Sequence, residues 1–169
     1  MISALIFAAA IQIAPIPPAL PEDPGPERRA AAVALFPRQA YVSEYSHGIN
    51  MAASRLSAEV LNAQGVNAYD RDFRLSDRFI ARVKAAPDGV IDQAIQCVAE
   101  PIAQRLYVPD LIALKAFAAS PEGRNFWSYF LSNQPWMACF DRPVRAYLTP
   151  FVESDLALVV AEKPGQAFQ

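Results

Sequence analysis

Apolar side chains recur at spacings of three and four residues beyond residue 26, and strand-like alternation is scarce. Such spacing is typical of amphipathic helices. The clearest stretch runs from Val90 to Leu106, where Asp88 can cap the helix. One face of this stretch carries Ile91, Ile95, Val98, Ile102 and Leu106. Pro101 falls inside it and predicts a kink or a division into two helices.

The same pattern predicts helices on both sides of this one, with prolines setting most boundaries. We expect helices over residues 27–36, 38–56, 76–86, 121–133 and 143–161, and one that begins at Pro109 with Leu111, Leu114 and Phe117 on its inner face. Ser76 is the expected cap of the third of these, and Pro150 an expected break in the last. Leu61 to Phe73 has few apolar residues and predicts a loop. The sequence therefore predicts an all-α fold, an irregular bundle of five to seven helices.

The first 26 residues differ in character from the rest. Ile2 to Ala14 is uncharged and mostly apolar, too short to span a bilayer but of the length found in signal peptides. No Lys or Arg precedes it, so a buried N-terminal helix is the alternative. Six prolines follow between Pro15 and Pro26 and predict an extended linker. We expect a signal peptide over residues 1–19, a proline-rich linker over 20–26, a helical domain over 27–162 and a flexible tail over 163–169.

Composition supports one globular domain and limits its partners. Of 169 residues, 53% are hydrophobic and 19% are charged, which is typical of a chain that folds around a core. The net charge is −2, with no block of like charge. Nucleic acids and anionic membranes are bound through a concentrated basic face, so neither is an expected partner. No membrane span is expected in the mature chain.

Few residues are suited to catalysis or metal binding. His47 is the one histidine, and with Ser43, Ser46 and Glu44 nearby it could be read as a hydrolase centre. No G-x-S-x-G motif accompanies it, and we interpret it as a surface or capping residue. Acidic and basic residues alternate between Asp70 and Arg78 without the spacing of a calcium loop, which indicates a solvated, salt-bridged surface. We expect no metal, no cofactor and no enzymatic activity.

A short motif lies between two of the predicted helices. Ser120 can cap the second helix, Pro121 suits its first position, and Glu122 lies at the positive end of its dipole. Gly123 costs about 1 kcal/mol relative to Ala inside a helix, so we interpret it as a place where a neighbouring backbone approaches closely. An anion held on the free amides of this helix start is the alternative, although Glu122 would repel it.

With Phe117, this motif reads aromatic-x-x-Ser-Pro-x-Gly, and the segment Tyr107 to Phe130 resembles domain-of-unknown-function family 2059. The similarity extends over about residues 75 to 135. Members are small, exported, all-helical bacterial proteins, so the resemblance implies export and a helical fold but no activity. The chain departs from the family at Val108, where Thr or Ser is usual, and at Ala118, where an aromatic is usual.

The two cysteines, Cys97 and Cys139, match no zinc or thioredoxin spacing. An exported chain meets an oxidising compartment, and both cysteines lie in or beside apolar helical segments. We therefore expect an intramolecular disulfide between them. Two buried free thiols are the alternative.

These expectations describe a periplasmic or secreted, non-enzymatic binding or interaction module of the bacterial envelope. The expected contact surface is aromatic and comprises Phe126, Trp127, Phe130 and Trp136. Their spacing covers more than one helix face, so most of them should lie in the core with one or two left to a groove. The alternative is an apolar small-molecule or lipid-binding protein, in which the same aromatics line a cavity.

Overall fold

The computed structural model describes residues 22–65, 69–85, 87–131 and 134–161, and in these ranges the chain is helical with no strand. The prediction of an all-α bundle is confirmed. The helices are α1 (Gly25–Val33), α2 (Val42–Ala63), α3 (Tyr69–Ala85), α4 (Pro87–Arg105), α5 (Val108–Ala119), α6 (Pro121–Leu131), α7 (Gln134–Leu148) and α8 (Val152–Ala161), with short 3-10 turns at Arg38–Ala40 and Thr149–Phe151. The expected signal peptide and tail lie outside the described residues.

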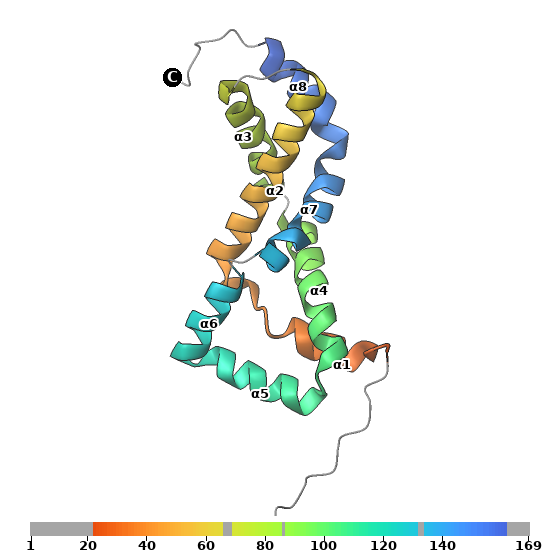
Figure 1. Ribbon diagram of the computed structural model, residues 1–169, viewed down its shortest axis with the longest axis vertical. Helices are drawn as coiled ribbons and strands as arrows, with labels where there is room; N and C mark the ends of the chain where they lie inside the picture. The colour runs from red at the N-terminus through yellow and green to blue at the C-terminus, as the bar shows by residue number, and fades with distance from the viewer. Residues whose placement is uncertain (1–21, 66–68, 86, 132–133, 162–169) are drawn as a thin grey trace, which may run out of the picture.

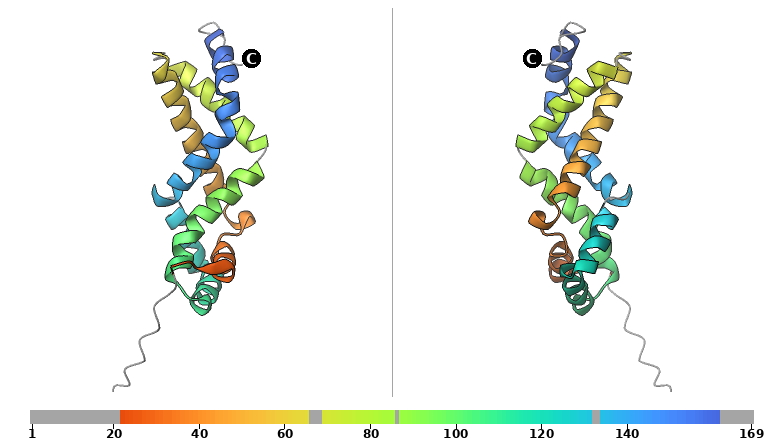
Figure 2. Two further views of the ribbon diagram at one scale, coloured as in Figure 1. Left: turned by 90° about the vertical axis from the view of Figure 1, so that its right-hand side faces the viewer. Right: turned by 90° about the vertical axis from the view of Figure 1, so that its left-hand side faces the viewer.

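The helices form an elongated molecule in which two ends differ (Figures 1 and 2). Helices α3 and α8 lie at one end, and α1, α5 and α6 lie at the other. Between them, α7 packs against both α2 and α4, while α3 packs on α2 and α8. At the opposite end α1 contacts α4 and α5, and α5 contacts α6. Helix α7 therefore connects the two ends through its contacts with α2 and α4.

Several predicted boundaries were wrong. Helix α1 begins at Gly25, inside the expected linker, because prolines at the first turn of a helix give up only donors that would be unpaired anyway. The expected loop at 61–73 is largely helical, since α2 continues to Ala63 and α3 begins at Tyr69. Ser76 lies inside α3 rather than at its start, and its hydroxyl is 2.8 Å from that of Ser54 on α2. Packing between α2 and α3 thus outweighs weak local helix signals.

Two prolines lie inside helices. Helix α4 runs through Pro101 without dividing, and α7 runs through Pro143 although the sequence predicted a helix that begins there. A proline removes one hydrogen bond from a helix, and burial of the neighbouring turns can offset this loss. The break expected at Pro150 is confirmed, because a 3-10 turn over Thr149–Phe151 separates α7 from α8.

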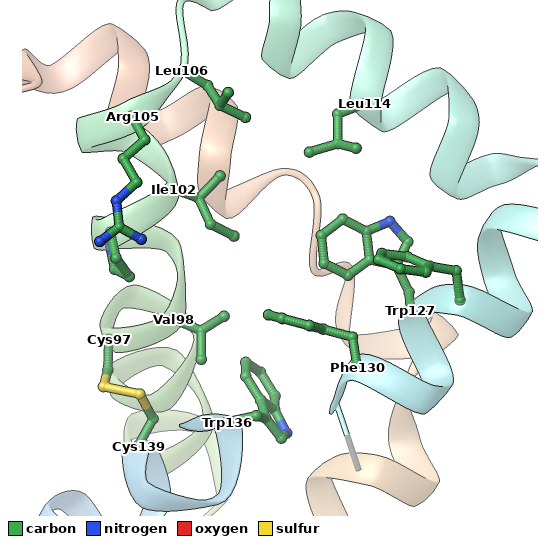
Figure 3. Close-up of a pocket in the computed structure, with 12 residues that line it drawn as sticks. Cys97, Val98, Ile102, Arg105, Leu106, Leu114, Trp127, Phe130, Trp136 and Cys139 are labelled. Carbon is green, nitrogen blue, oxygen red and sulfur yellow. A yellow bond between two sulfur atoms is a disulfide. The ribbon is translucent and has the colours of Figure 1, made fainter. Parts of the chain in front are cut away.

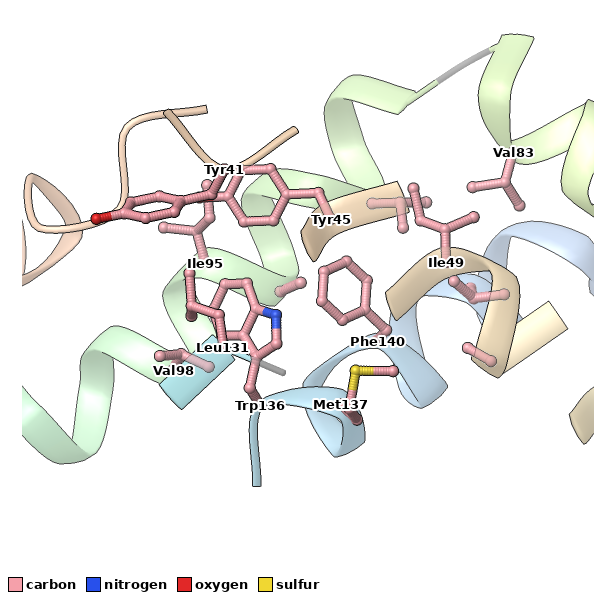
Figure 4. Packing of buried hydrophobic residues seen from close by; sticks show 14 of the residues in the cluster. Tyr41, Tyr45, Ile49, Val83, Ile95, Val98, Leu131, Trp136, Met137 and Phe140 are labelled. Carbon is pink, nitrogen blue, oxygen red and sulfur yellow. The ribbon is translucent and has the colours of Figure 1, made fainter. Parts of the chain in front are cut away.

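The centre of the core is aromatic and tightly packed (Figure 4). Trp136 lies 5.5 Å from Tyr45 and 5.4 Å from Phe140, measured between ring centroids. Gly48 of α2 faces the ring of Phe140 so closely that an added Cβ would lie 2.4 Å from Cδ2. A glycine inside a helix costs about 1 kcal/mol relative to Ala, but the lack of a side chain at Gly48 is what allows α2 to approach α7.

A nearly buried ion pair joins α3 to α8. Arg82 donates through Nε and Nη2 to the two carboxylate oxygens of Asp155, at 2.5 and 2.7 Å. The Asp155 side chain is only 1% exposed, whereas that of Arg82 is 36% exposed and lies over the ring of Phe151. The hydrogen bond and charge of Asp155 raise the pKa of Arg82. Neither residue belongs to the charged stretch from Asp70 to Arg78, for which the sequence predicts a solvated, salt-bridged surface. Within that stretch, Asp72 accepts a hydrogen bond from buried Ser57.

Candidate functional site

The expected disulfide is confirmed: Cys97 of α4 and Cys139 of α7 are bonded, with their Cα atoms 5.6 Å apart. Cys97 is exposed and Cys139 is partly buried. The bond joins the two helices that form the middle of the molecule, close to the start of α7. It therefore holds α4, which forms one wall of the candidate site, against α7.

The turn between α5 and α6 has the expected geometry. Ser120 Oγ accepts a hydrogen bond from the amide of Gly123 at 3.0 Å, which confirms its capping role. Gly123 lies so close to α5 that an added Cβ would be 1.9 Å from the carbonyl oxygen of Phe117. The expected inner face of α5 is correct for Leu111, which is fully buried, but Phe117 is 44% exposed. The turn thus holds the start of α6 closely against the end of α5.

The four aromatics of the expected contact surface lie around one hollow but differ in exposure. Trp127 and Trp136 are 3% and 1% exposed, Phe130 is partly buried, and Phe126 is 51% exposed. Trp127 and Phe130 meet edge to face at 5.1 Å, and Phe126 stacks against Phe130 at 6.5 Å. Most of this set is core and one or two members face a groove, as the sequence predicted.

The hollow is a pocket of about 560 Å³ between α4, α5, α6 and α7 (Figure 3). Helix α4 supplies one wall and α6 and α7 supply the opposite aromatic wall, with Leu114 contributed by α5. The α4 wall consists of Cys97, Val98, Pro101, Ile102 and Arg105, continued by Leu106. The disulfide lies at one edge. Exposure of Pro101, Arg105 and Phe126 shows that the pocket opens to solvent.

The interior of the pocket is apolar. Indole Nε1 of Trp127 and of Trp136 has no hydrogen-bond partner among the described residues. In both residues the six-membered part of the indole faces the hollow and the nitrogen is turned away from it (Figure 3). Arg105 is the one charged side chain among the described lining residues. The arrangement can enclose a hydrocarbon body but offers no group that would activate a substrate.

A partly buried carboxylate orients the aromatic wall. Ser128, adjacent to Trp127 on α6, donates to Glu44 of α2 at 2.5 Å, and Ser43 donates to the other oxygen at 2.6 Å. Burial acts to raise the pKa of Glu44, but the hydrogen bonds from Ser128, from Ser43 and from the backbone N–H of Glu44 itself together outweigh it and hold the pKa below its ordinary value. The ionised carboxylate therefore links α6 to α2 and fixes the side of α6 that faces the pocket.

The other candidate chemistry is not assembled. His47 is exposed on α2, and among the described residues it makes no hydrogen bond or ion pair with Ser43, Ser46 or Glu44. No group of three or more His, Cys, Asp or Glu side chains could hold a metal ion in the described part of the chain. None of the described helices is long and apolar enough to cross a membrane.

Sequence reasoning found the aromatic half of the pocket and missed the α4 half. The sequence predicts Val98, Ile102 and Leu106 only as one face of an amphipathic helix, and the structure shows that these residues line the pocket. Arg105 was not singled out, because a lone arginine in the last turn of a helix is common and favourable. The sequence does place Arg105 beside the apolar stripe of α4. That position indicates a pocket only once the structure shows α6 lying opposite the stripe.

No protein-family model, no curated protein and no solved structure matches the chain. The resemblance to domain-of-unknown-function family 2059 therefore stays a prediction.

Proposed function

We propose that this chain is a non-enzymatic binding protein whose pocket between α4, α5, α6 and α7 holds an apolar small molecule. The pocket itself carries the proposal. Its volume of about 560 Å³ lies within the roughly 300–1,000 Å³ of small-molecule sites, and its lining is almost wholly aliphatic and aromatic. Contiguous apolar surface of this kind is costly to leave in water unless a ligand or partner covers it.

A protein partner on the same aromatics has weaker support. Trp127 and Trp136 are almost fully buried, so a macromolecule docking on this face would reach Phe126 and part of Phe130 only. Interface hot spots are enriched in tryptophan, but they must be accessible to the partner. A small molecule inside the pocket can reach Ile102 of α4 and Leu114 of α5 as well as these two phenylalanines, which makes it the better occupant.

We place this binding protein in the periplasm or outside the cell. The apolar stretch at residues 2–14 supports export. The Cys97–Cys139 disulfide supports an oxidising compartment, because disulfides persist outside the cytosol and are rare within it.

Native mass spectrometry of the protein purified from its own host tests the proposal, and we expect a co-purifying ligand that is released on unfolding. Both tryptophans of the chain line the pocket, so intrinsic fluorescence should also change when a ligand binds. Leu114→Phe adds bulk inside the pocket and should weaken binding. Ile112→Phe is the matched control, because Ile112 lies on the same helix with 62% exposure.

Equal binding by the Leu114→Phe and Ile112→Phe variants would place the ligand elsewhere. A protein that carries no ligand from its host and shows no fluorescence change with any apolar compound would contradict the proposal. Intact mass of the mature protein tests the location: a start between Ile11 and Glu22 indicates cleavage of an export signal, whereas full-length protein retained in the cytoplasm contradicts export.

A further inference from the structure

The charge of the pocket is unbalanced. Arg105, in the last turn of α4, is exposed and lines the pocket, and its guanidinium lies at the pocket edge (Figure 3). Other arginines that contact α4 are neutralised: Arg29 pairs with Glu100 at 2.9 Å and Arg38 pairs with Asp92 at 2.7 Å. Arg105 has no carboxylate partner among the described residues.

A ligand for this pocket must match two surfaces at once. Its body must be apolar, because the indole nitrogens are turned away and no other polar side chain of the described lining faces the hollow. Its polar group must lie at the open edge, where water and Arg105 are available. A guanidinium presents paired N–H donors that fit the two oxygens of a carboxylate or phosphate.

We propose that the pocket takes a single-chain amphiphile with an anionic head group, its hydrocarbon chain between α4 and the aromatic wall and its head group on Arg105. The inference rests on the proposed function and adds to it the class of ligand. Each methylene removed from water contributes to affinity, while Arg105 selects the head group. Fatty acids and single-chain lipid phosphates share this chemistry.

The test compares probes with the same twelve-carbon chain and different head groups: dodecanoate, dodecyl phosphate, dodecanol and dodecyltrimethylammonium. Each is titrated into the full chain below its micelle concentration, with tryptophan fluorescence and calorimetry as readouts. We expect both anions to bind about fivefold more tightly than dodecanol, the size of effect that an exposed ion pair supports. The cationic probe should bind most weakly. A preference between the two anions distinguishes a fatty acid from a lipid phosphate.

Substitution of Arg105 assigns the selectivity to one side chain. Arg105→Gln should lose the fivefold preference for anions and leave the affinity for dodecanol unchanged, while Arg105→Lys should keep part of the preference. Arg142→Gln is the control, because Arg142 is exposed on α7 and lines a separate hollow on the other side of the disulfide.

The outcomes separate this inference from the proposed function. Binding of all four probes with equal affinity, or retention of the anion preference in Arg105→Gln, overturns the anionic ligand while the apolar pocket stands. Failure of every probe to bind overturns both. Arg105 also lies at the negative end of the α4 dipole, and a merely structural role there would lower the stability of Arg105→Gln without changing its preference among head groups.

Discussion

Similar apolar stripes produce a closed core at one end of the molecule and an open pocket at the other. In the core end, formed by α2, α3, α7 and α8, Gly48 lets α2 approach Phe140, and Arg82 pairs with buried Asp155. In the pocket end, α5, α6, the second half of α4 and the start of α7 surround about 560 Å³. Helix spacing, rather than residue type, therefore decides whether an aromatic stripe is closed into the core or lines a pocket.

The largest effect is expected from the disulfide, which joins α4 to α7 in the middle of the molecule. Closing a loop of about 43 residues stabilises a fold by roughly 4 kcal/mol on the chain-entropy model, and measured values are often lower. Reduction of Cys97–Cys139, or the double change Cys97→Ser and Cys139→Ser, should therefore lower the free energy of unfolding by about 2–4 kcal/mol in urea titrations. Alkylatable thiols in denatured, unreduced protein would contradict the bond itself.

The next largest effect should come from the ion pair of the core end. Arg82→Met leaves the carboxylate of Asp155 buried without its partner, which is among the costlier changes in a protein interior. Arg145→Met is the matched control, because Arg145 pairs with Glu59 where both side chains are about half exposed. We expect a clearly larger drop in the urea midpoint for Arg82→Met. Equal drops would show that the core end is less closed than the burial of Asp155 indicates.

Substitutions at three glycines test directly how closely the helices pack at the two ends. Gly48→Ala and Gly123→Ala should each destabilise by about 1–3 kcal/mol, because the added methyl meets Phe140 at the core end and the Phe117 carbonyl at the pocket end. Gly89→Ala, in the first turn of α4, meets nothing within 4 Å and should instead stabilise by up to about 1 kcal/mol. The sign of the change in melting temperature is the test. A melting temperature that rises in Gly123→Ala would show that α5 and α6 are not held together at this turn.

The smallest effect concerns Tyr45, whose hydroxyl donates to the buried carbonyl of Phe36 at 2.9 Å. Burial raises the pKa of this phenol, and nearby Tyr41 and Glu44 raise it further. An unfolded tyrosine loses its proton near pH 10, so the stability from neutral Tyr45 is fully present below about pH 10 and is lost as the pH rises toward the folded pKa. Tyr45→Phe should cost about 1 kcal/mol at neutral pH and reduce the alkaline loss.

Urea midpoints of wild type and Tyr45→Phe at about pH 8 and about pH 11 check this expectation. Tyr41 also has a raised pKa from burial, so part of the alkaline loss should remain in the variant. An alkaline loss of the same size in both proteins would show that Tyr45 is not the residue that holds its proton in the core end.

Features that depend on neighbours along the chain can be predicted from the amino-acid sequence alone. The stripe on Val90 to Leu106 is sufficient to identify α4, and Ser120 with Pro121 is sufficient to place the start of α6. These signals are local, because capping and amphipathic spacing act within one or two helical turns. The sequence also predicts the disulfide, from the expected export and from the apolar segments around both cysteines.

Only the tertiary structure decided the features that depend on residues far apart. Pro101 and Pro143 lie inside helices, since contacts between helices offset one missing hydrogen bond, and no local rule shows this. Arg82 and Asp155 are 73 positions apart, and neither has a sequence signal for the other. The pocket has the same origin: its walls come from four helices, and the distance between α4 and α6 is set by the whole bundle. A hydrophobic pattern records which face of a helix avoids water, but not whether protein or ligand covers it.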